Sequence, residues 1–577
     1  MIPATDRPTQ PITPGARPLD TSRLLDSRGE ISPRVLTELL DHAVETWPDR
    51  ICIDFLGREW TYAAIGREVD RVAKGLQAEG LAPGDRFGLC LPNTPYSVIL
   101  YFAVLRAGGV VVNLNPLYSP GEVEFLITDS GAKMVATVDL EIIHGKVADS
   151  FGNGVLEKLV LCPMADVLPW LKSVGLRTLK RKELARRRNG VDYINYRTLA
   201  AHEPSPTVVE RDPDDVAVLQ YTGGTTGRPK GAMLTHANLA ANSAQMILHV
   251  GEERDEQEVT LGVLPLFHVF ALTCVMNFGI DTGSQLVLLP RFEIDQVLGT
   301  FKRKTITQIF AVPTIYNALG SLPDDKVPDL SAVKTSISGG APLPLDIRLQ
   351  YEKRTGSPVS EGYGLTEAAP IITCQPLLGR EPAKENSAGP RFPFTTIEIR
   401  DPETGECCRG VEEKGEICAR GPQVMKGYWN RPDATEKTFV DGALRTGDIG
   451  YLDKDGYLFI VDRMKDLILC SGYNVYPRVI EDAAYEHPAV KEAIAIGVPD
   501  DYRGEAPKLF VALHEGEELD AGTLNAFLKM RLNPIEMPDS YEFRNELPKT
   551  LVGKLEKKVL VEEEKAKAAA RKSGETT

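Results

Sequence analysis

A glycine- and threonine-rich segment, residues 221–231, carries the clearest chemical signal in the sequence. It reads YTGGTTGRPKG, so three glycines and three threonines precede Lys230. A glycine-rich backbone can turn several N–H groups toward one anion, threonine hydroxyls add donors, and a lysine adds a mobile positive charge. The segment therefore predicts a loop that holds a polyphosphate. It differs from a Walker A loop because Lys230 follows Pro229 instead of glycine and precedes Gly231 instead of serine or threonine.

Four later segments carry groups that suit the other parts of a nucleotide. They read SGGAPL at 338–343, EGYGLTE at 361–367, LRTGD at 444–448 and VDRMKD at 461–466. An aromatic face suits a base and a carboxylate suits Mg²⁺, while an aspartate and an arginine can accept from and donate to two vicinal hydroxyls. Taken alone, EGYGLTE is equally well explained as a turn with Glu367 capping a helix. Asp448 and Arg463 would elsewhere make an ordinary surface salt bridge.

Together these segments resemble the acyl-adenylate-forming superfamily, which includes acyl-CoA synthetases, firefly luciferase and the adenylation domains of peptide synthetases. They occur in the family's order, and the resemblance runs from about Tyr62 to Lys558. It implies that the first segment is the family's phosphate loop and that 338–343 is its adenine-contacting turn. It assigns Tyr363 to packing against adenine, Thr366 to the α-phosphate and Glu367 to Mg²⁺. The nucleotide-binding residues implied by these segments are Thr222, Gly223, Gly224, Thr225, Thr226, Lys230, Gly339, Gly340, Ala341, Pro342, Tyr363 and Gly364.

The resemblance also assigns roles toward the C-terminus. Asp448 and Arg463 would bind the ribose hydroxyls, and Lys465 falls where the family has its interdomain hinge. Ser471, Gly472 and Tyr473 would belong to the face that receives CoA. Lys554, at the end of the segment ELPKTLVGK, matches the catalytic lysine of adenylation. The attack of a carboxylate on a phosphate joins two anions, so a positioned cation is needed where charge develops.

Two mostly apolar segments, 264–270 and 311–316, resemble the walls of the family's acyl pocket. The implied substrate-binding residues are His268, Phe270, Thr314 and Gly339. The pocket segment does not begin with the aspartate that would bind an α-ammonium group, which weighs against amino-acid adenylation. His268 is explained equally well as a gate to the pocket and as a satisfied core residue.

The predicted function is that of an ATP-dependent fatty acid:CoA ligase acting on a medium- to long-chain acid, with ATP, Mg²⁺ and CoA. Later segments such as 427–435 look most like bacterial long-chain fatty-acid:CoA ligases. A ligase for dicarboxylates of the pimelate type is the close alternative. More distant alternatives are a luciferase-like oxygenase and a nucleotide-binding protein without catalysis.

Strands alternating with helices along most of the chain predict an α/β fold with parallel sheets flanked by helices. Ile51–Phe55, Arg86–Leu91, Val110–Val112 and Lys133–Val138 are expected to be strands, with helices over 33–47, 62–79 and 95–107. Residues 389–461 are expected to be β-rich, with two strands joined across the turn residues 454–456, and a βαβ-like region follows. The predicted division is a flexible arm over 1–34, an AMP-binding domain over 35–462, a small mobile α+β domain over 463–565 that carries the catalytic lysine, and a polar tail over 566–577. The longest uncharged run, 259–280, is interpreted as buried strand and turn.

Charge and cysteine content restrict the setting of the protein. The 577 residues carry a formal charge of −15, which argues against a general nucleic-acid binder. Nine cysteines without a metal-binding spacing fit a reducing cytoplasm, and the N-terminus lacks the apolar core of a secretory signal. We therefore expect a cytoplasmic protein, with a homodimer as one possible assembly.

One stretch runs against the acidic background. Residues 170–188 hold eight basic residues and one acidic residue, with leucines among the cations. Residues 168–188 are equally well explained as an amphipathic helix on the anionic inner face of the membrane and as a solvated surface insertion.

Overall fold

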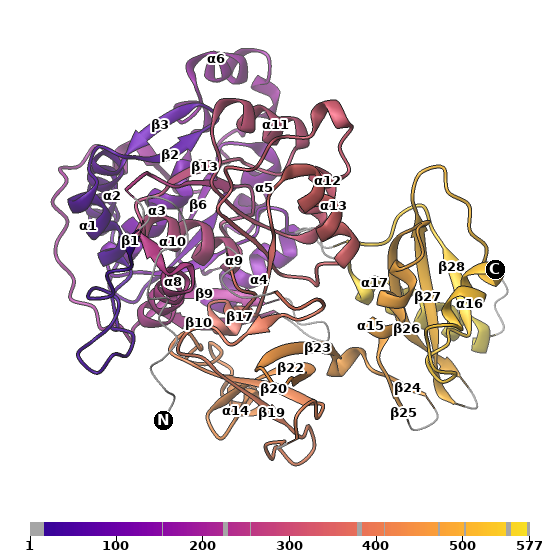
Figure 1. The fold of residues 1–577 in the computed structure, drawn as a ribbon. Helices are drawn as coiled ribbons and strands as arrows, with labels where there is room; N and C mark the ends of the chain where they lie inside the picture. Colours follow the sequence, from indigo (N-terminus) through magenta and orange to yellow (C-terminus); the bar gives the residue numbers. More distant parts are fainter. Residues whose placement is uncertain are drawn as a thin grey trace.

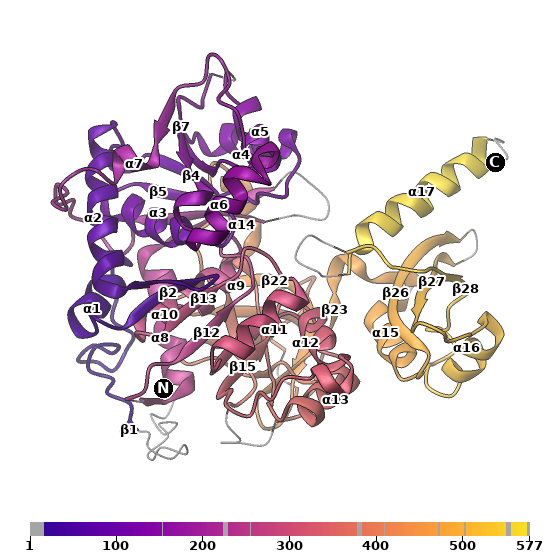
Figure 2. The same cartoon turned by 90° about the horizontal axis from the view of Figure 1, so that it is seen from above.

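The computed structural model describes residues 17–573, apart from 153, 223–228, 254, 378–382, 409, 471–472, 501–502 and 550–554. Its larger part is built on two extended sheets with helices around them, and the C-terminal part lies to one side (Figures 1 and 2). The fold is the predicted α/β arrangement of mainly parallel sheets, with a β-rich part and a smaller α+β part.

The first sheet has seven strands in the order β10-β9-β5-β4-β6-β7-β8. All neighbouring strands are parallel except β9 and β10, which form an antiparallel pair. Its strands are mostly buried apolar runs, as expected for a sheet covered on both faces. Their bounds are β4 (Arg86–Cys90), β5 (Val110–Asn113), β6 (Met134–Val138), β7 (Lys158–Cys162), β8 (Tyr193–Asn195), β9 (Val216–Thr222) and β10 (Lys230–Thr235).

The second sheet has eight strands in the order β17-β16-β15-β14-β12-β13-β2-β3. Its interior is parallel, and antiparallel strands stand at both edges. The bounds are β2 (Ile51–Phe55), β3 (Arg58–Thr61), β12 (Val259–Gly262), β13 (Gln285–Leu288), β14 (Gln308–Ala311), β15 (Thr335–Ser338), β16 (Ser360–Gly364) and β17 (Ile371–Cys374).

Local signals in the sequence set where the helices begin and end. In α8 (His236–Val250), the Thr235 side chain accepts a hydrogen bond from the backbone N–H of Asn238, and Gly251 ends the helix at φ 67°. The main helices of the larger part are α1 (Thr37–Thr46), α2 (Tyr62–Ala78), α3 (Pro95–Arg106), α4 (Pro120–Ser130), α5 (Glu141–Asp149), α6 (Trp170–Thr178), α7 (Tyr196–Leu199), α8, α11 (Ile294–Arg303), α12 (Pro313–Gly320) and α13 (Leu345–Thr355).

The interpretation of residues 259–280 as strand and turn is only partly right. Strand β12 is followed by a continuous helical segment that consists of α9 (Val269–Ala271), the π-helical η3 (Leu272–Asn277) and α10 (Phe278–Asp281). The segment is buried on all sides, so its sequence lacks the polar face that marks a surface helix. Over the described ranges, no helix combines the length and apolarity that a bilayer crossing requires.

A third, antiparallel sheet forms the predicted β-rich part, in the order β18-β23-β22-β20-β19 with β21 beside β22. It contains β18 (Gly389–Pro390), β19 (Thr396–Arg400), β20 (Gly415–Arg420), β21 (Phe439–Val440), β22 (Ala443–Leu452) and β23 (Tyr457–Arg463), with α14 (Pro432–Thr438) before β21. The hairpin predicted across residues 454–456 joins β22 to β23.

The C-terminal part has its own apolar core, formed by residues between Ile468 and Leu532. The strands expected in the βαβ-like region are β26 and β27, and they pair antiparallel, so this expectation is wrong. A parallel βαβ unit is formed instead by β27, α16 and β28, the last of which is not among the expected strands. Its elements are β24 (Ile468–Cys470), β25 (Tyr473–Val475), α15 (Pro477–Tyr485), β26 (Val490–Asp500), β27 (Gly504–Leu513), α16 (Ala521–Leu528), β28 (Ser540–Phe543) and α17 (Lys557–Ser573).

Candidate active site

Asp448 and Arg463 face each other across the β22–β23 hairpin. They are register partners, and Nε of Arg463 lies 3.1 Å from Oδ1 of Asp448. The Tyr363 hydroxyl, from the end of β16, donates to Oδ2 of the same carboxylate over 2.5 Å. Asp448 is nearly buried, whereas Arg463 is more than half exposed. Arg463, which is predicted to bind ribose, and Tyr363, which is predicted to pack against adenine, therefore both contact the carboxylate of Asp448.

Glu367 and Lys230 lie on either side of Tyr428. The Tyr428 hydroxyl donates to Oε1 of Glu367 over 2.7 Å, and the Nζ atom of Lys230 lies 5.1 Å from the centre of the Tyr428 ring. Glu367 sits in the short 3₁₀ helix η5 (Thr366–Ala368) that follows β16. The lysine predicted to bind phosphate and the carboxylate predicted to bind Mg²⁺ thus share a neighbour.

Backbone pairing explains how segments so distant in sequence come together. Strand β10 runs beside residues 425–429, because Met233 N–H donates to Gly427 C=O and Trp429 N–H donates to Gly231 C=O, both over 2.8 Å. At the other end of that segment, Met425 N–H donates to Glu367 C=O over 2.8 Å. Segment 425–429 therefore connects the strand that begins with Lys230 to the helix that carries Glu367.

The electrostatics keep both phenols protonated. Burial, followed by the nearby Asp448 carboxylate, holds the pKa of Tyr363 well above its usual range. Burial and Glu367 do the same for Tyr428. The Asp448 carboxylate raises the pKa of Arg463, while burial and the charge of Arg463 lower that of Lys465. Both tyrosines consequently act as hydrogen-bond donors to carboxylates.

The predicted acyl-pocket residues gather at the carboxyl ends of neighbouring parallel strands. Gly339 follows β15 and its N–H donates to Ala311 C=O over 3.1 Å, at the end of β14 just before Thr314 of α12. A Cβ atom on Gly339 would lie 3.1 Å from the Phe270 ring, so these two residues are in close contact. His268 accepts from Phe270 N–H over 3.3 Å and caps α9, which gives this side chain a structural role. Of the remaining turn, Gly340 and Pro342 are exposed and Ala341 is half-buried.

Several predicted residues fall outside the described ranges. They are Gly223, Gly224, Thr225 and Thr226 of the phosphate loop, Ser471 and Gly472 of the CoA face, and Lys554. Thr222 and Lys230, which flank the loop, are register partners in the β9–β10 pair. Tyr473 lies in β25.

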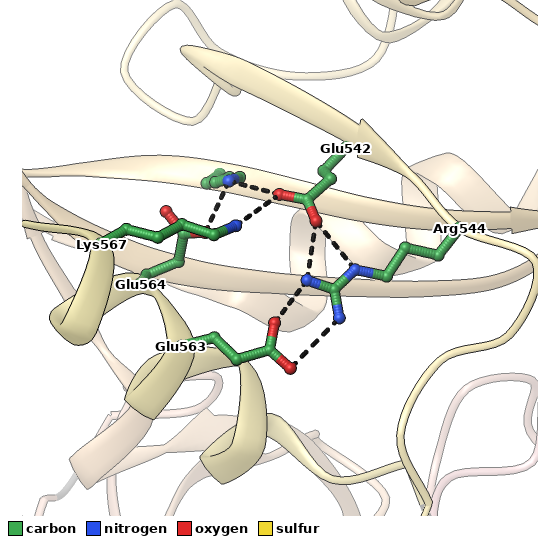
Figure 3. A network of polar contacts seen from close by, with 6 residues as sticks. Glu542, Arg544, Glu563, Glu564 and Lys567 are labelled. Carbon is green, nitrogen blue, oxygen red and sulfur yellow. Dashed lines mark hydrogen bonds and ion pairs between the residues drawn. The ribbon is translucent and has the colours of Figure 1, made fainter. Parts of the chain in front are cut away.

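Backbone pairing and an ion pair fix the chain on either side of residues 550–554. Lys549 and Leu555 form an antiparallel bridge, Glu556 N–H donates to Pro548 C=O over 2.8 Å, and Lys549 pairs with Glu492 at 2.5 Å. Helix α17, which starts at Lys557, is attached to the sheet by the polar network in Figure 3. In this network, Arg544 pairs with Glu542 and Glu563, and Lys567 pairs with Glu542 and Glu564.

A single carboxylate is available where Mg²⁺ is expected. No group of three or more potential metal-ligating side chains occurs within the described ranges. Mg²⁺ commonly takes one or two carboxylates and completes its shell with water and substrate phosphates. Glu367, oriented by Tyr428, fits that pattern.

Tyr428 is the functional candidate that sequence reasoning did not single out. It stands in the segment 427–435 that indicated a long-chain ligase, but no spacing rule connects it with Glu367, which lies 61 residues earlier. The predicted residues form two contact groups, Lys230 with Glu367 at Tyr428 and Tyr363 with Arg463 at Asp448, and the charge of Glu367 acts on Arg463. Their roles toward a nucleotide stay predictions.

Comparison with known proteins agrees with this geometry. Residues 40–429 match the family model of AMP-binding enzymes, and residues 479–554 match that of the AMP-binding enzyme C-terminal domain. The long-chain-fatty-acid–CoA ligase of Bacillus subtilis is 41% identical over 540 residues, covering 92% of this chain and 95% of the relative. That of Salmonella typhimurium is 37% identical over 563 residues, covering 94% and 97%.

A solved structure shows the same likeness in three dimensions. ATP-bound MatB from Rhodopseudomonas palustris superposes with a TM-score of 0.79 at 30% identity, covering 91% of this chain and 98% of the other. Two family models match this chain, and a ligase of the family matches it over nearly the whole length of both proteins. The chain therefore belongs to the AMP-binding enzyme family.

Proposed function

We propose that the protein is an ATP-dependent long-chain fatty acid:CoA ligase that works through an acyl-AMP intermediate. The observation that carries this proposal is that Lys230 and Glu367 meet at Tyr428, while Asp448 contacts Tyr363, which precedes Glu367 in the same segment. Lys230, Glu367 and Asp448 suit a triphosphate, its metal ion and a ribose, respectively. Relatives that carry the ligase name match over nearly their whole length.

The proposed reaction has two steps. The carboxylate of the fatty acid attacks the α-phosphorus of ATP, which forms acyl-AMP and releases pyrophosphate. The CoA thiol then attacks the acyl carbon, which forms the thioester and releases AMP. A carboxylate oxygen is a poor leaving group, and adenylation converts it into a good one.

Each proposed residue has one task. The segment 222–230 holds the phosphates, Thr366 hydrogen-bonds the α-phosphate, and Asp448 with Arg463 holds the ribose. Mg²⁺, when bound at Glu367, would neutralise phosphate charge. Lys554 supplies the cation at the α-phosphate, where the two anions meet.

We further propose that residues 35–462 and 463–565 act as two domains with Lys465 at the hinge. A rotation there would withdraw Lys554 and present residues 471–473 to CoA. Loops on either side of a hinge commonly serve two half-reactions in this way.

Replacement of Lys554 tests the proposed catalytic role. Lys554→Ala should reduce ATP–pyrophosphate exchange at least about a thousandfold, since it removes a cation from the reacting phosphate. ATP binding, measured by calorimetry, should change little. The control is Lys558→Ala, because Lys558 stands four residues away and pairs with Glu562 at 3.8 Å. Undiminished exchange in Lys554→Ala would refute the role.

A substrate series tests chain length. Palmitate should support pyrophosphate exchange and CoA consumption with a higher kcat/KM than octanoate, and pimelate should support neither. The mostly apolar walls around Phe270 favour an alkyl chain over a second carboxylate. A preference for pimelate would select the dicarboxylate alternative.

We also propose that the protein contacts an anionic membrane through residues 168–188. The basic stretch stands out from a chain whose formal charge is −15. Long-chain fatty acids partition into bilayers, so a ligase at the membrane surface would meet its substrate there.

A further inference from the structure

A cavity of about 440 Å³ opens beside α6, far from the nucleotide site. Helix α6 stands at the top of the molecule in Figure 1, whereas β22 and β23 lie near the bottom. The cavity belongs to the connection between β7 and β8, which ends at the edge strand of the first sheet. Its polar and aromatic walls are Arg58, Asp166, Trp170, Ser173, Arg177 and Arg197.

Two guanidinium groups in this cavity share the Asp166 carboxylate, and a third contacts the backbone of the same residue. Arg177 lies 3.0 Å from Oδ1 of Asp166, and Arg197 makes two hydrogen bonds of 2.5 Å to its two oxygens. Arg58 donates to the backbone carbonyl of Asp166 instead. The four side chains therefore carry a net charge of +2. A second cavity of about 520 Å³ shares Arg58, Asp166 and Arg197 and adds Arg67, Arg71 and Glu68, of which Arg71 and Glu68 form an ion pair.

The arginines keep donor capacity for a further anion. Each guanidinium has five N–H donors, and the single carboxylate uses only some of them. The side chains of Arg177 and Arg197 are 56% and 63% exposed, so an incoming group can reach them from solvent. A planar guanidinium binds phosphate in a bidentate manner, which makes a phosphate ester the best chemical match.

Large exposed apolar side chains lie on and just after α6, the helix that contributes Trp170 to the cavity wall. Trp170, Leu171 and Val174 of α6 are 73%, 66% and 51% exposed, and Leu179 just beyond the helix is 91% exposed. Such side chains are seldom so exposed together unless they meet a partner or a membrane. The structure also corrects the expectation of one helix over 168–188, because α6 ends at Thr178 and a 3₁₀ turn, η2 (Arg181–Glu183), follows.

Unpaired cations stand next to these apolar residues. Among the ion pairs of the described residues, none includes Lys172, Arg181, Lys182 or Arg186. By contrast, Arg188 pairs with Glu141 and Asp149, which fastens the end of the stretch to α5. The stretch therefore presents an anchored surface on which apolar and cationic side chains alternate.

We propose that this surface docks on a bilayer of anionic phospholipid, with a headgroup phosphate bound in the Arg58–Arg177–Arg197 cavity and Trp170, Leu171 and Leu179 inserted at the acyl boundary. The proposal builds on the proposed membrane contact and names its ligand and its residues. Charge complementarity selects an anionic surface, since each Lys or Arg close to it strengthens binding about fivefold. The acidic remainder of the chain favours the orientation in which only this face approaches the lipid.

Vesicle binding by the full-length protein tests the proposal. It should co-sediment with phosphatidylcholine vesicles that contain phosphatidylglycerol and remain in solution with phosphatidylcholine alone. The emission of Trp170, the exposed tryptophan, should shift to shorter wavelength on binding, and Trp170→Phe should remove that shift. Absence of both responses would overturn the proposal.

A matched pair of variants separates a headgroup site from general charge attraction. The cavity variant carries Arg58→Gln, Arg177→Gln and Arg197→Gln, and the control carries Arg181→Gln, Lys182→Gln and Arg186→Gln, so both lose three charges. The cavity variant should lose binding of micelle-free dihexanoyl-phosphatidylglycerol at least about tenfold, since the bidentate contacts are gone, while the control should keep it. Equal losses would refute a specific site.

Two further measurements distinguish the remaining outcomes. If inorganic phosphate displaces the soluble lipid as effectively as phosphatidylglycerol vesicles do, the cavity binds free phosphate and the docking proposal fails. Trp170→Ser with Leu171→Ser changes only exposed residues and should weaken vesicle binding at an unchanged melting temperature. CoA ligation of soluble octanoate should be the same in all variants, and the absence of ligation of both octanoate and palmitate by the unmodified protein would refute the ligase proposal alone.

Discussion

Tyr428 contacts both Glu367, the carboxylate proposed to bind Mg²⁺, and Lys230, the lysine proposed to bind phosphate. Its hydroxyl donates to Glu367 and its ring lies under Lys230. Replacement by phenylalanine keeps the ring and removes the donor. A hydrogen bond to a charged group contributes about 1.5–3 kcal/mol, so Tyr428→Phe should lower kcat/KM for MgATP by about 10- to 100-fold.

The loss in Tyr428→Phe should depend on magnesium. A carboxylate that is no longer oriented binds the ion less well, so more Mg²⁺ should be needed for half-maximal pyrophosphate exchange. Tyr451→Phe is the control, because the Tyr451 ring stacks on Phe459 with centroids 5.0 Å apart, away from Glu367. An identical Mg²⁺ dependence in both variants would contradict this role.

At the scale of the element, β16 ends at Gly364, a position with no room for a side chain, just before Thr366 and Glu367. A Cβ atom on Gly364 would lie 1.9 Å from the carbonyl oxygen of Pro370, at the end of the β16–β17 pair. Gly364→Ala must therefore push the strands apart and move Thr366 and Glu367. We expect a destabilisation of about 1–3 kcal/mol with a larger loss of pyrophosphate exchange.

A second glycine provides the comparison for Gly364→Ala. Gly121 lies in α4, and a Cβ atom there would meet nothing within 4 Å. Gly121→Ala should leave activity unchanged and leave the melting temperature equal or slightly higher, because alanine favours the helix. Equal melting temperatures for the two variants would show that β16 adjusts without cost.

The elements best predicted from sequence are those with a single period or a continuous apolar run. The strand expected over Ile51–Phe55 is β2, and the hairpin over 454–456 joins β22 to β23. The helix over 269–281 was interpreted as strand and turn, because a fully buried helix shows neither period. The contact between Tyr428 and Glu367 depends on tertiary pairing of 425–429 with β10, which local sequence does not encode.

At the scale of the whole molecule, Glu361 lies where the larger part meets α15. Burial raises its pKa to about 7, and Arg478 of α15 opposes that shift while Asp482 adds to it. The folded protein thus binds a proton here between the ordinary value of 4.5 and about 7, where the unfolded chain has released it. This group's contribution to stability falls as the pH rises through that window.

Glu361→Gln should remove this pH dependence. At pH 8 the variant should have a higher melting temperature than the unmodified protein, with a gain of up to about 3 kcal/mol in the free energy of unfolding. At pH 5 the two proteins should differ little. Differential scanning calorimetry at both pH values measures the difference. Glu403→Gln, in an exposed turn, is the control for loss of charge. A gain of equal size at both pH values would exclude titration of Glu361 as the cause.

In the hairpin of β22 and β23, the Asp448–Arg463 pair lies at the end far from the connecting turn. Asp448 and Arg463 are opposite one another at the open end, and a register irregularity lies between this pair and residues 450–460. Strand β23 has one extra residue at this irregularity, so the pairing register at the open end of the hairpin is not fixed by the register next to the turn. We expect a turn of another length in place of Asp453–Gly456 to leave Asp448 and Arg463 opposite one another, so this tip is a suitable place to insert a tag or a fluorophore that would report on the proposed domain movement.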